Sequence, residues 1–210
     1  MSVIPLFPTL LHWADVNNFD LIQKELIDFC YDQKKLYPEG LHQSNKGNSW
    51  HSKTHYMNTK NILSTTVYST VFDYFENSGA FKKGVNLSFH NAWININSTG
   101  GYNDTHNHAG SLLSGVLWVK SSKDSGNIVF TNPAIYNEFK IINELTEEAR
   151  DSFHKFNDYY REPVDGMMFM FPGHLLHRVG SNESNEDRIS ISFNLSFGCH
   201  PIVNILNYPS

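Results

Sequence analysis

The stretch 85-Val-Asn-Leu-Ser-Phe-His-Asn-Ala-Trp-Ile-Asn-Ile-96 decides how this chain folds, because the hydrophobic periodicity changes there. Upstream, apolar residues recur at the spacing of amphipathic helices, over residues 17–34 and from about 58 to 77. From residue 85 onward the side chains alternate with the two-residue period of a β-strand. Both alternating sets contain apolar residues, so we predict a long strand with both faces partly covered.

Further segments that resemble strands follow, each bounded by turn residues: 112–120, 127–131, 166–172 and 188–197. Two helices followed by six or more strands favour a mainly β fold with flanking helices, either a β-sandwich or a jelly roll. We expect one domain over residues 1–210, divided into an N-terminal support (1–84), a jelly-roll core (85–198) and a C-terminal tail (199–210).

Composition narrows the class of protein. The 210 residues are 40% hydrophobic and 18% charged, which is typical of a globular domain. A net charge of -5 gives no sign of binding to nucleic acid or to anionic membranes. No apolar run reaches the ~18 residues of a membrane span. Cys30 and Cys199 fit no metal or disulfide spacing, so we expect reduced thiols and a cytoplasmic location, in a host cell if the gene is of phage origin.

Two histidines, His106 and His108, lie between Gly101 and the strand-like segment 112–120. In an extended chain, residues two apart point to the same side, so the two imidazoles can converge on one point. This arrangement is half of a metal site. The alternative is a pair of solvated histidines in a polar loop, because a bare His-x-His motif is weak.

The last predicted strand carries polar residues on one face, including Arg188 and Ser190, and aliphatic residues on the other. If the polar face points into the barrel, a buried guanidinium requires an anion. A carboxylate matches the planar fork of Arg188, and Ser190 can donate to the same group. The alternative is a solvated edge strand.

The order His106-x-His108, then His177, then Arg188-x-Ser190 resembles the 2-oxoglutarate- and Fe(II)-dependent dioxygenases. The resemblance covers about residues 85–198. It is nearest to uncharacterised phage and bacterial oxygenases that carry a His-x-His motif and a Trp-x-Asn strand, here Trp93-Ile-Asn95. It implies a double-stranded β-helix, which is a cupin-like jelly roll.

The resemblance also implies roles for individual residues. His106 and His177 match the family's iron-binding histidines. Arg188, assisted by Ser190, matches the residue that binds the distal carboxylate of 2-oxoglutarate, and Asn95 is a further candidate for holding the cosubstrate or the substrate. The implied reaction oxidises a C–H bond of an unknown substrate and decarboxylates 2-oxoglutarate to succinate. The implied partners are the small-molecule cosubstrate and an unknown substrate; the sequence does not indicate an oligomeric state.

This chain departs from the family at His108, where an Asp or Glu is usual. His108 can be a third ligand, or lie beside the site with water completing the coordination, or Asp104 can supply the carboxylate. His174 is a rival to His177, which we prefer for its spacing to Arg188.

Two other functions stay open at this point. One is a cupin-like metalloprotein with three histidine ligands that does not use 2-oxoglutarate. The other is a non-enzymatic jelly-roll module that binds a partner or belongs to a virion. Substrate choice would depend on the loops at 36–57 and 134–163, which carry no motif.

Overall fold

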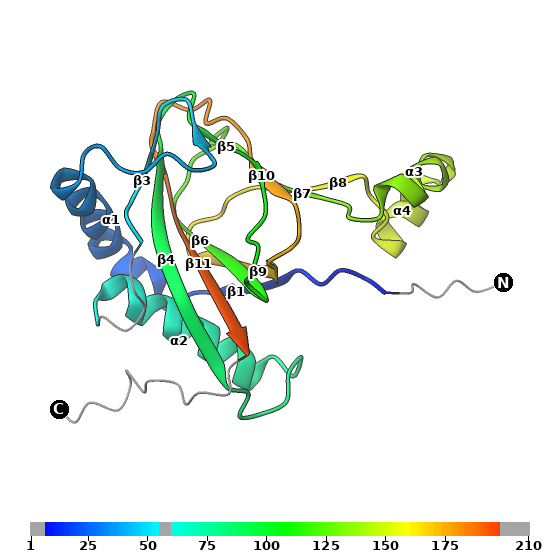
Figure 1. Ribbon diagram of the computed structural model, residues 1–210, viewed down its shortest axis with the longest axis horizontal. Coiled ribbons are helices and arrows are strands. Elements are labelled where there is room, and N and C mark those ends of the chain that lie inside the picture. Colours follow the sequence, from blue (N-terminus) through cyan, green and yellow to red (C-terminus); the bar gives the residue numbers. More distant parts are fainter. Residues whose placement is uncertain (1–6, 55–59, 198–210) are drawn as a thin grey trace.

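The computed structural model describes residues 7–54 and 60–197, and it consists of two antiparallel β-sheets with helices against one of them (Figure 1). In spatial order, the larger sheet contains β1 (His12–Asp15), β9 (Met167–Pro172), β6 (Leu113–Lys120), β11 (Arg188–Phe197), β4 (Leu87–Asn97) and β3 (Ser49–His51). The smaller sheet contains β2 (Asn45–Lys46), β5 (Tyr102–His106), β10 (His177–Val179), β7 (Ile128–Thr131) and β8 (Asp158–Arg161). The predicted mainly β fold with flanking helices is confirmed.

Two helices, α1 (Phe19–Leu36) and α2 (Ile62–Asn77), cover one face of the larger sheet (Figure 1). Leu26 of α1 and Val67 of α2 are fully buried in the same core as Ile191 of β11. We expected α2 to begin near residues 58–59, which lie outside the described residues. It begins after Asn61, whose side chain accepts the backbone N–H of Ser64 in a capping box.

The central strand β11 separates two environments. Its aliphatic residues point to the helices, and its polar residues point to the smaller sheet. Ser190 and Asn194 are no more than 9% exposed, and the strand is paired on both sides, by β4 and β6. The solvated edge strand considered as an alternative is therefore wrong. A second, smaller core lies between the sheets and includes Trp118, Phe130 and Phe171.

Gly115 of β6 packs closely against β11 on the side of the sheet that faces the helices. It lies opposite Phe193 of β11, and a Cβ atom added to it would lie 2.1 Å from the phenyl ring. The glycine therefore makes room for a large side chain in the core.

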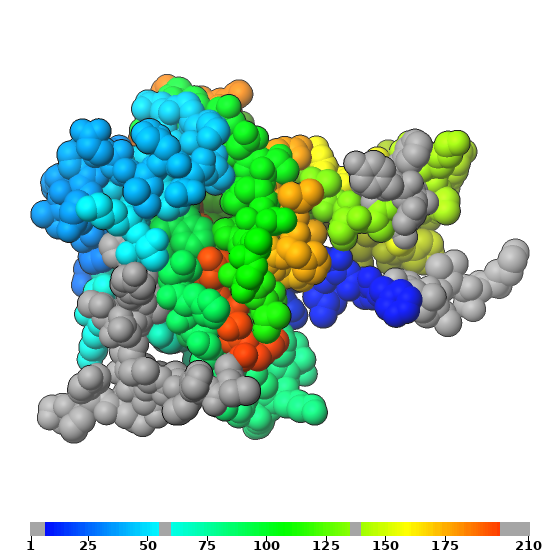
Figure 2. Space-filling view, viewed as in Figure 1, coloured from blue at the N-terminus to red at the C-terminus, as the bar shows by residue number. Residues whose placement is uncertain are grey.

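The segment 134–163 is more structured than predicted. We expected a loop there, but the segment contains two helices, α3 (Ile135–Glu144) and α4 (Glu147–Phe153), and β8 then forms an edge of the smaller sheet. Thr146 caps the start of α4, and His154, with a φ of 50°, ends it. The two helices project away from the sheets (Figures 1 and 2).

The segment 36–57, expected to be a loop, contributes the short strands β2 and β3, one to each sheet. The N-terminal segment supplies β1 (His12–Asp15), which forms one edge of the larger sheet by pairing with β9. Cys199 and the predicted C-terminal tail lie outside the described residues, and Cys30 is a buried free thiol. Among the described helices, none has the length and apolar character needed to cross a membrane.

Candidate metal centre

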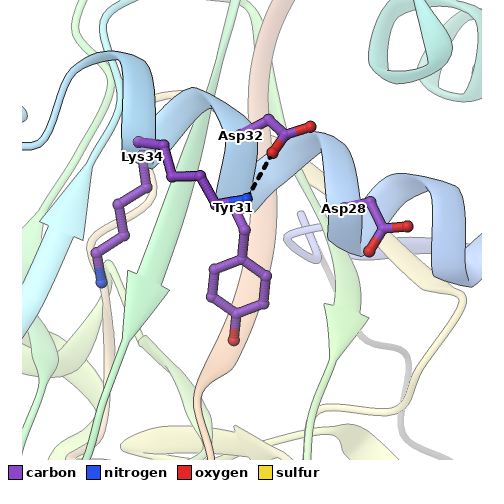
Figure 3. A pocket seen from close by; sticks show the side chains of 5 residues that line it. Asp28, Tyr31, Asp32 and Lys34 are labelled. Carbon is purple, nitrogen blue, oxygen red and sulfur yellow. Dashed lines mark hydrogen bonds and ion pairs between the residues drawn. The ribbon is translucent and has the colours of Figure 1, made fainter.

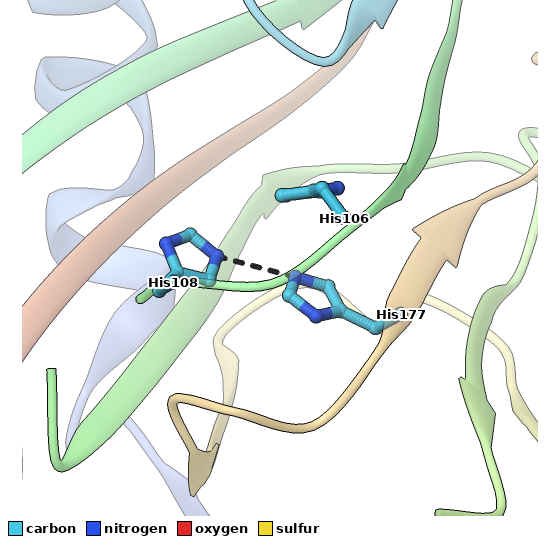
Figure 4. A group of neighbouring side chains, drawn as sticks. All are labelled: His106, His108 and His177. Atoms are coloured by element: carbon cyan, nitrogen blue, oxygen red, sulfur yellow. Dashed lines mark hydrogen bonds between the residues drawn. The ribbon is translucent and has the colours of Figure 1, made fainter. Parts of the chain in front are cut away.

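Three histidines meet between the two sheets (Figure 4). His106 ends β5 and His177 begins β10, and the two are directly opposite each other in the antiparallel pairing of these strands. His108 follows two residues later in the loop after β5. The nitrogen atoms that they offer to a metal all lie within 4.8 Å of one another. The structure therefore brings together all three histidines that the sequence singled out.

Backbone carbonyls set the tautomers of two of these rings. Nδ1 of His106 lies 2.7 Å from the carbonyl oxygen of Asp104, and Nδ1 of His177 lies 2.9 Å from that of Leu175. Each Nδ1–H therefore donates to the backbone, and each Nε2 keeps its lone pair for the space between the rings. The Nε2 atoms of His108 and His177 are 3.3 Å apart. Two imidazole nitrogens on one ion at a right angle would be separated by about 3 Å, given bonds of about 2.1 Å.

Burial keeps this cluster uncharged at neutral pH. Desolvation, assisted by the neighbouring His106, lowers the pKa of His108 to about 4 and that of His177 to about 3. The pKa of His106 is also lowered, chiefly by desolvation. Neutral imidazole is the form that coordinates a metal, so these three histidines would not have to lose protons before binding one.

No carboxylate belongs to the cluster within the described part of the chain. The Asp104 side chain is exposed, and it accepts the backbone N–H of Thr105 at 2.8 Å. His174 is also exposed and lies outside the cluster, whereas His177 is only 4% exposed. The geometry thus groups His108, and neither Asp104 nor His174, with the other two histidines.

A cavity of about 30 Å³ adjoins the histidines, enough for roughly one water molecule. The sheet residues that line it are mainly polar: Trp93, Asn95, Asn103, Ser190 and Ser192. Phe171, Ile128 and Val179 form its apolar wall.

Arg188 lies at the start of β11, on the same face as Ser190, and is 1% exposed. Its Nη1 donates to the carbonyls of Ser125 and Gly126, and to that of Gly180 at 2.9 Å. Its Nε and Nη2 are buried, and neither has a hydrogen-bond partner among the residues that the structure describes. Desolvation lowers the pKa of Arg188 to about 10, so the group is still charged at neutral pH. A buried cation with two free donors, which forms no ion pair with a described carboxylate, is suited to bind an anion.

Two further buried polar atoms without partners lie on either side of Ser190. Asn95, which is opposite Ser190 on β4, donates to Ser192 at 3.2 Å, but its Oδ1 accepts nothing. Trp118, opposite Ser190 on β6, has a buried Nε1 without an acceptor. Near Ser190, the donors of Arg188 and Trp118 and the acceptor of Asn95 thus form no hydrogen bonds with one another or with other described residues. A small polar molecule bound there could satisfy them.

Several residues of this region were not predicted. Ser44, beside β2, has its hydroxyl 3.5 Å from Nε2 of His106, and Asn103 of β5 approaches the same hydroxyl. His51 lies in β3 and is buried, with only 7% of its surface exposed. No local signal in the sequence identifies them, because only the pairing of β2 and β3 with distant strands brings them here.

A second hollow lies on the exposed side of α1, lined by Asp28, Tyr31, Asp32, Lys34 and Lys35 (Figure 3). Its Lys35–Asp32 ion pair, at 2.9 Å, is formed by side chains that are 76% and 62% exposed. Such pairs contribute little, and no buried polar groups converge there. It therefore lacks the features of a binding site.

Residues 91–194 match the family described as "Putative 2OG-Fe(II) oxygenase". No curated protein matches the sequence. Among solved structures, a prolyl-4-hydroxylase from Pseudomonas putida aligns with a TM-score of 0.57 at 15% identity, over 89% of this chain and 92% of that chain.

Two other solved structures are similar. A viral collagen prolyl hydroxylase from Paramecium bursaria Chlorella virus-1, in complex with 2-oxoglutarate, has a TM-score of 0.56 at 13% identity, over 88% of this chain and 94% of that chain. HygX from Streptomyces hygroscopicus, with nickel, 2-oxoglutarate and hygromycin B bound, has a TM-score of 0.61 at 8% identity, over 92% and 85% of the respective chains. These likenesses confirm the predicted double-stranded β-helix.

Proposed function

Given that this chain belongs to the 2-oxoglutarate- and Fe(II)-dependent oxygenases, we propose that His106, His108 and His177 hold its iron. In the same proposal, Arg188, Ser190 and Asn95 hold 2-oxoglutarate. The observation that carries it is the convergence of three neutral imidazoles on a cavity that Ser190 also lines, together with Arg188 on the same face of β11, a buried guanidinium whose Nε and Nη2 have no partner among the described residues. When bound, iron and 2-oxoglutarate supply the oxidation of a substrate C–H bond, coupled to decarboxylation of 2-oxoglutarate to succinate.

Arg188 has the geometry of a carboxylate receptor. Its Nη1 is already held by backbone carbonyls, which fixes the orientation of the guanidinium plane. Nε and Nη2 then present one edge with two parallel donors, which matches the two oxygens of a carboxylate. Ser190 adds a hydroxyl on the same face of the strand, two residues away.

Gly126 makes this position of Arg188 possible. With a φ of +91°, it adopts a conformation that favours glycine, and a Cβ atom there would lie 2.7 Å from Nη1 of Arg188. The close approach of the Gly126 backbone therefore holds the guanidinium in place for the carboxylate.

The apolar wall of the cavity shields His177 from water. The ring of Phe171 meets that of His177 edge to face, with centroids 4.6 Å apart, and Phe130 packs against both. A dry environment strengthens electrostatic interactions between the site and an anionic cosubstrate.

His108 changes the charge of the site. An imidazole in place of a carboxylate leaves the metal centre one unit more positive. With three neutral imidazoles, Fe(II) would keep both of its positive charges, and the Arg188 guanidinium adds a third. Bound 2-oxoglutarate carries two negative charges and would leave the site with one positive charge. The set of residues therefore favours an anionic cosubstrate, which supports the use of 2-oxoglutarate over a metalloprotein that binds no such anion.

The proposal extends to partners and location. The partners are the small-molecule cosubstrate and an unknown substrate, whose class would be set by the segments 36–57 and 134–163. A cytoplasmic site of action fits the buried, unpaired thiol of Cys30, because reduced thiols persist in that compartment.

Anaerobic titration of the purified protein with Fe(II) and 2-oxoglutarate tests this function. We expect the visible charge-transfer absorption of the iron–2-oxoglutarate chelate, and slow conversion of 2-oxoglutarate to succinate once oxygen is admitted. The variants H106A and H177A should show neither. If the wild-type protein gives no band and no succinate, the proposal is wrong.

A further inference from the structure

The His108 ring is held differently from the other two rings. His106 and His177 each donate Nδ1–H to a backbone carbonyl. Nδ1 of His108 has no hydrogen-bond partner among the described residues, and its Nε2 faces that of His177. The backbone of His108 is anchored, because its N–H donates to the carbonyl of Gly173 at 2.7 Å. The imidazole itself therefore lacks the partner that usually orients a metal-binding histidine.

An aromatic contact takes the place of that hydrogen bond. The indole of Trp93 stacks on the His108 ring, with centroids 5.4 Å apart and planes inclined by 28°. Trp93 lies in β4 opposite Ser192 of β11, and the pairing of β4 with β3 ends two residues further on, at Asn95. Its side chain also lines the cavity.

A second ring supports Trp93. His51 of β3 stacks on the indole with its plane inclined by only 10° and a centroid distance of 5.8 Å. His51 is buried, and its Nδ1 lies 2.6 Å from the carbonyl of Ser52, which fixes the ring. The three rings of His51, Trp93 and His108 thus form a continuous stack from the sheet edge to the metal centre.

We propose that Trp93, supported by His51, is the positioning residue that orients the His108 imidazole in the metal site. The inference rests on the proposed function, because it takes His108 as a ligand. Stacking fixes the plane of a ring, as the backbone hydrogen bonds do for His106 and His177. Loss of the stack should therefore weaken the binding of the metal by His108. The orientation of His106 and His177 should not change.

Binding of Co(II) alone, followed by its visible absorption and by calorimetry, tests the role of Trp93. We expect Trp93→Leu to weaken Co(II) binding about tenfold or more, which is the range for loss of an orienting partner. Trp93→Phe keeps a flat ring and should bind within about threefold of wild type, and Trp93→Met replaces Trp93→Leu if the latter does not fold. His51→Leu should weaken binding in the same direction. Trp50→Leu is the matched control, because Trp50 is a buried indole in the helix-side core, and it should bind Co(II) as wild type does.

A double-mutant cycle separates orientation of His108 from a general structural effect. In the H108A background, Trp93→Leu should cause no further loss of Co(II) affinity. An equal loss in both backgrounds, or wild-type affinity in folded Trp93→Leu, overturns the role of Trp93. The proposed function fails by a different result, namely H106A and H177A proteins that bind Co(II) as tightly as wild type.

Discussion

His106 and His177 lie directly opposite each other across two antiparallel strands, although 71 positions separate them in the sequence. Their ring centroids are 4.3 Å apart. The pairing of β5 with β10 therefore sets the spacing of these two proposed ligands, whereas the position of His108 depends on a loop. Substitution of His108 should therefore affect metal affinity differently from substitution of His106 or His177.

Replacement of His108 by Asp should restore a carboxylate to the site. We expect H108D to keep Fe(II) binding, because a carboxylate is an effective oxygen ligand, whereas H108A should lose about tenfold or more in affinity. Metal analysis and Fe(II) titration measure both. Equal affinity in H108A and wild type would show that His108 is not a ligand.

Replacement of Arg188 by Lys should separate binding of 2-oxoglutarate from binding of the metal. Lys keeps the charge but loses the two-donor edge, so we expect 2-oxoglutarate to bind at least about tenfold more weakly. Co(II) affinity should not change. The control is R178K, because Arg178 is half-buried on β10 and paired with Asp158, away from the cavity. A wild-type dissociation constant for 2-oxoglutarate in R188K would contradict this role.

Replacement of Gly115 by Ala should destabilise the fold without touching the histidines. The added methyl group would overlap the ring of Phe193, and such overpacking costs about 1–3 kcal/mol. Urea unfolding gives the free energy of unfolding. In the double variant G115A/F193L the smaller side chain frees the space, so the penalty of G115A should shrink in the F193L background.

Cys30 should resist thiol reagents in the folded protein. It is fully buried in the core under α1, and desolvation raises its pKa to about 12. Only the thiolate reacts, and its fraction stays small up to pH 9 in the folded state. In a C199S background, which leaves Cys30 as the one cysteine, labelling at pH 8 should be slow in buffer and fast in urea. Fast labelling in buffer would mean that α1 detaches readily from the sheet.

The alternation of the last strand was sufficient to predict its bounds and its two faces, because a period of two is a local property. The same holds for α1, whose apolar stripe is contained in one segment. Long-range pairing could not be predicted in this way. Ser44 and His51 come to the site only because β2 and β3 add to the edges of separate sheets. The state of Arg188 could not be predicted for the same reason. Strands that are distant in the sequence decide whether its side chain is buried and which partners it meets.

The proposed site divides its residues between the two sheets. The histidines at 106 and 177 belong to the smaller sheet, and the arginine and serine at 188 and 190 belong to the larger one. A ligand that contacts both sheets holds them together while it is bound. Because it binds the folded state and not the unfolded state, its binding stabilises the fold. Binding of metal and cosubstrate should therefore protect the protein from heat and proteolysis. Cosubstrate binding would then strengthen the association of the two sheets as well as prepare the site for reaction.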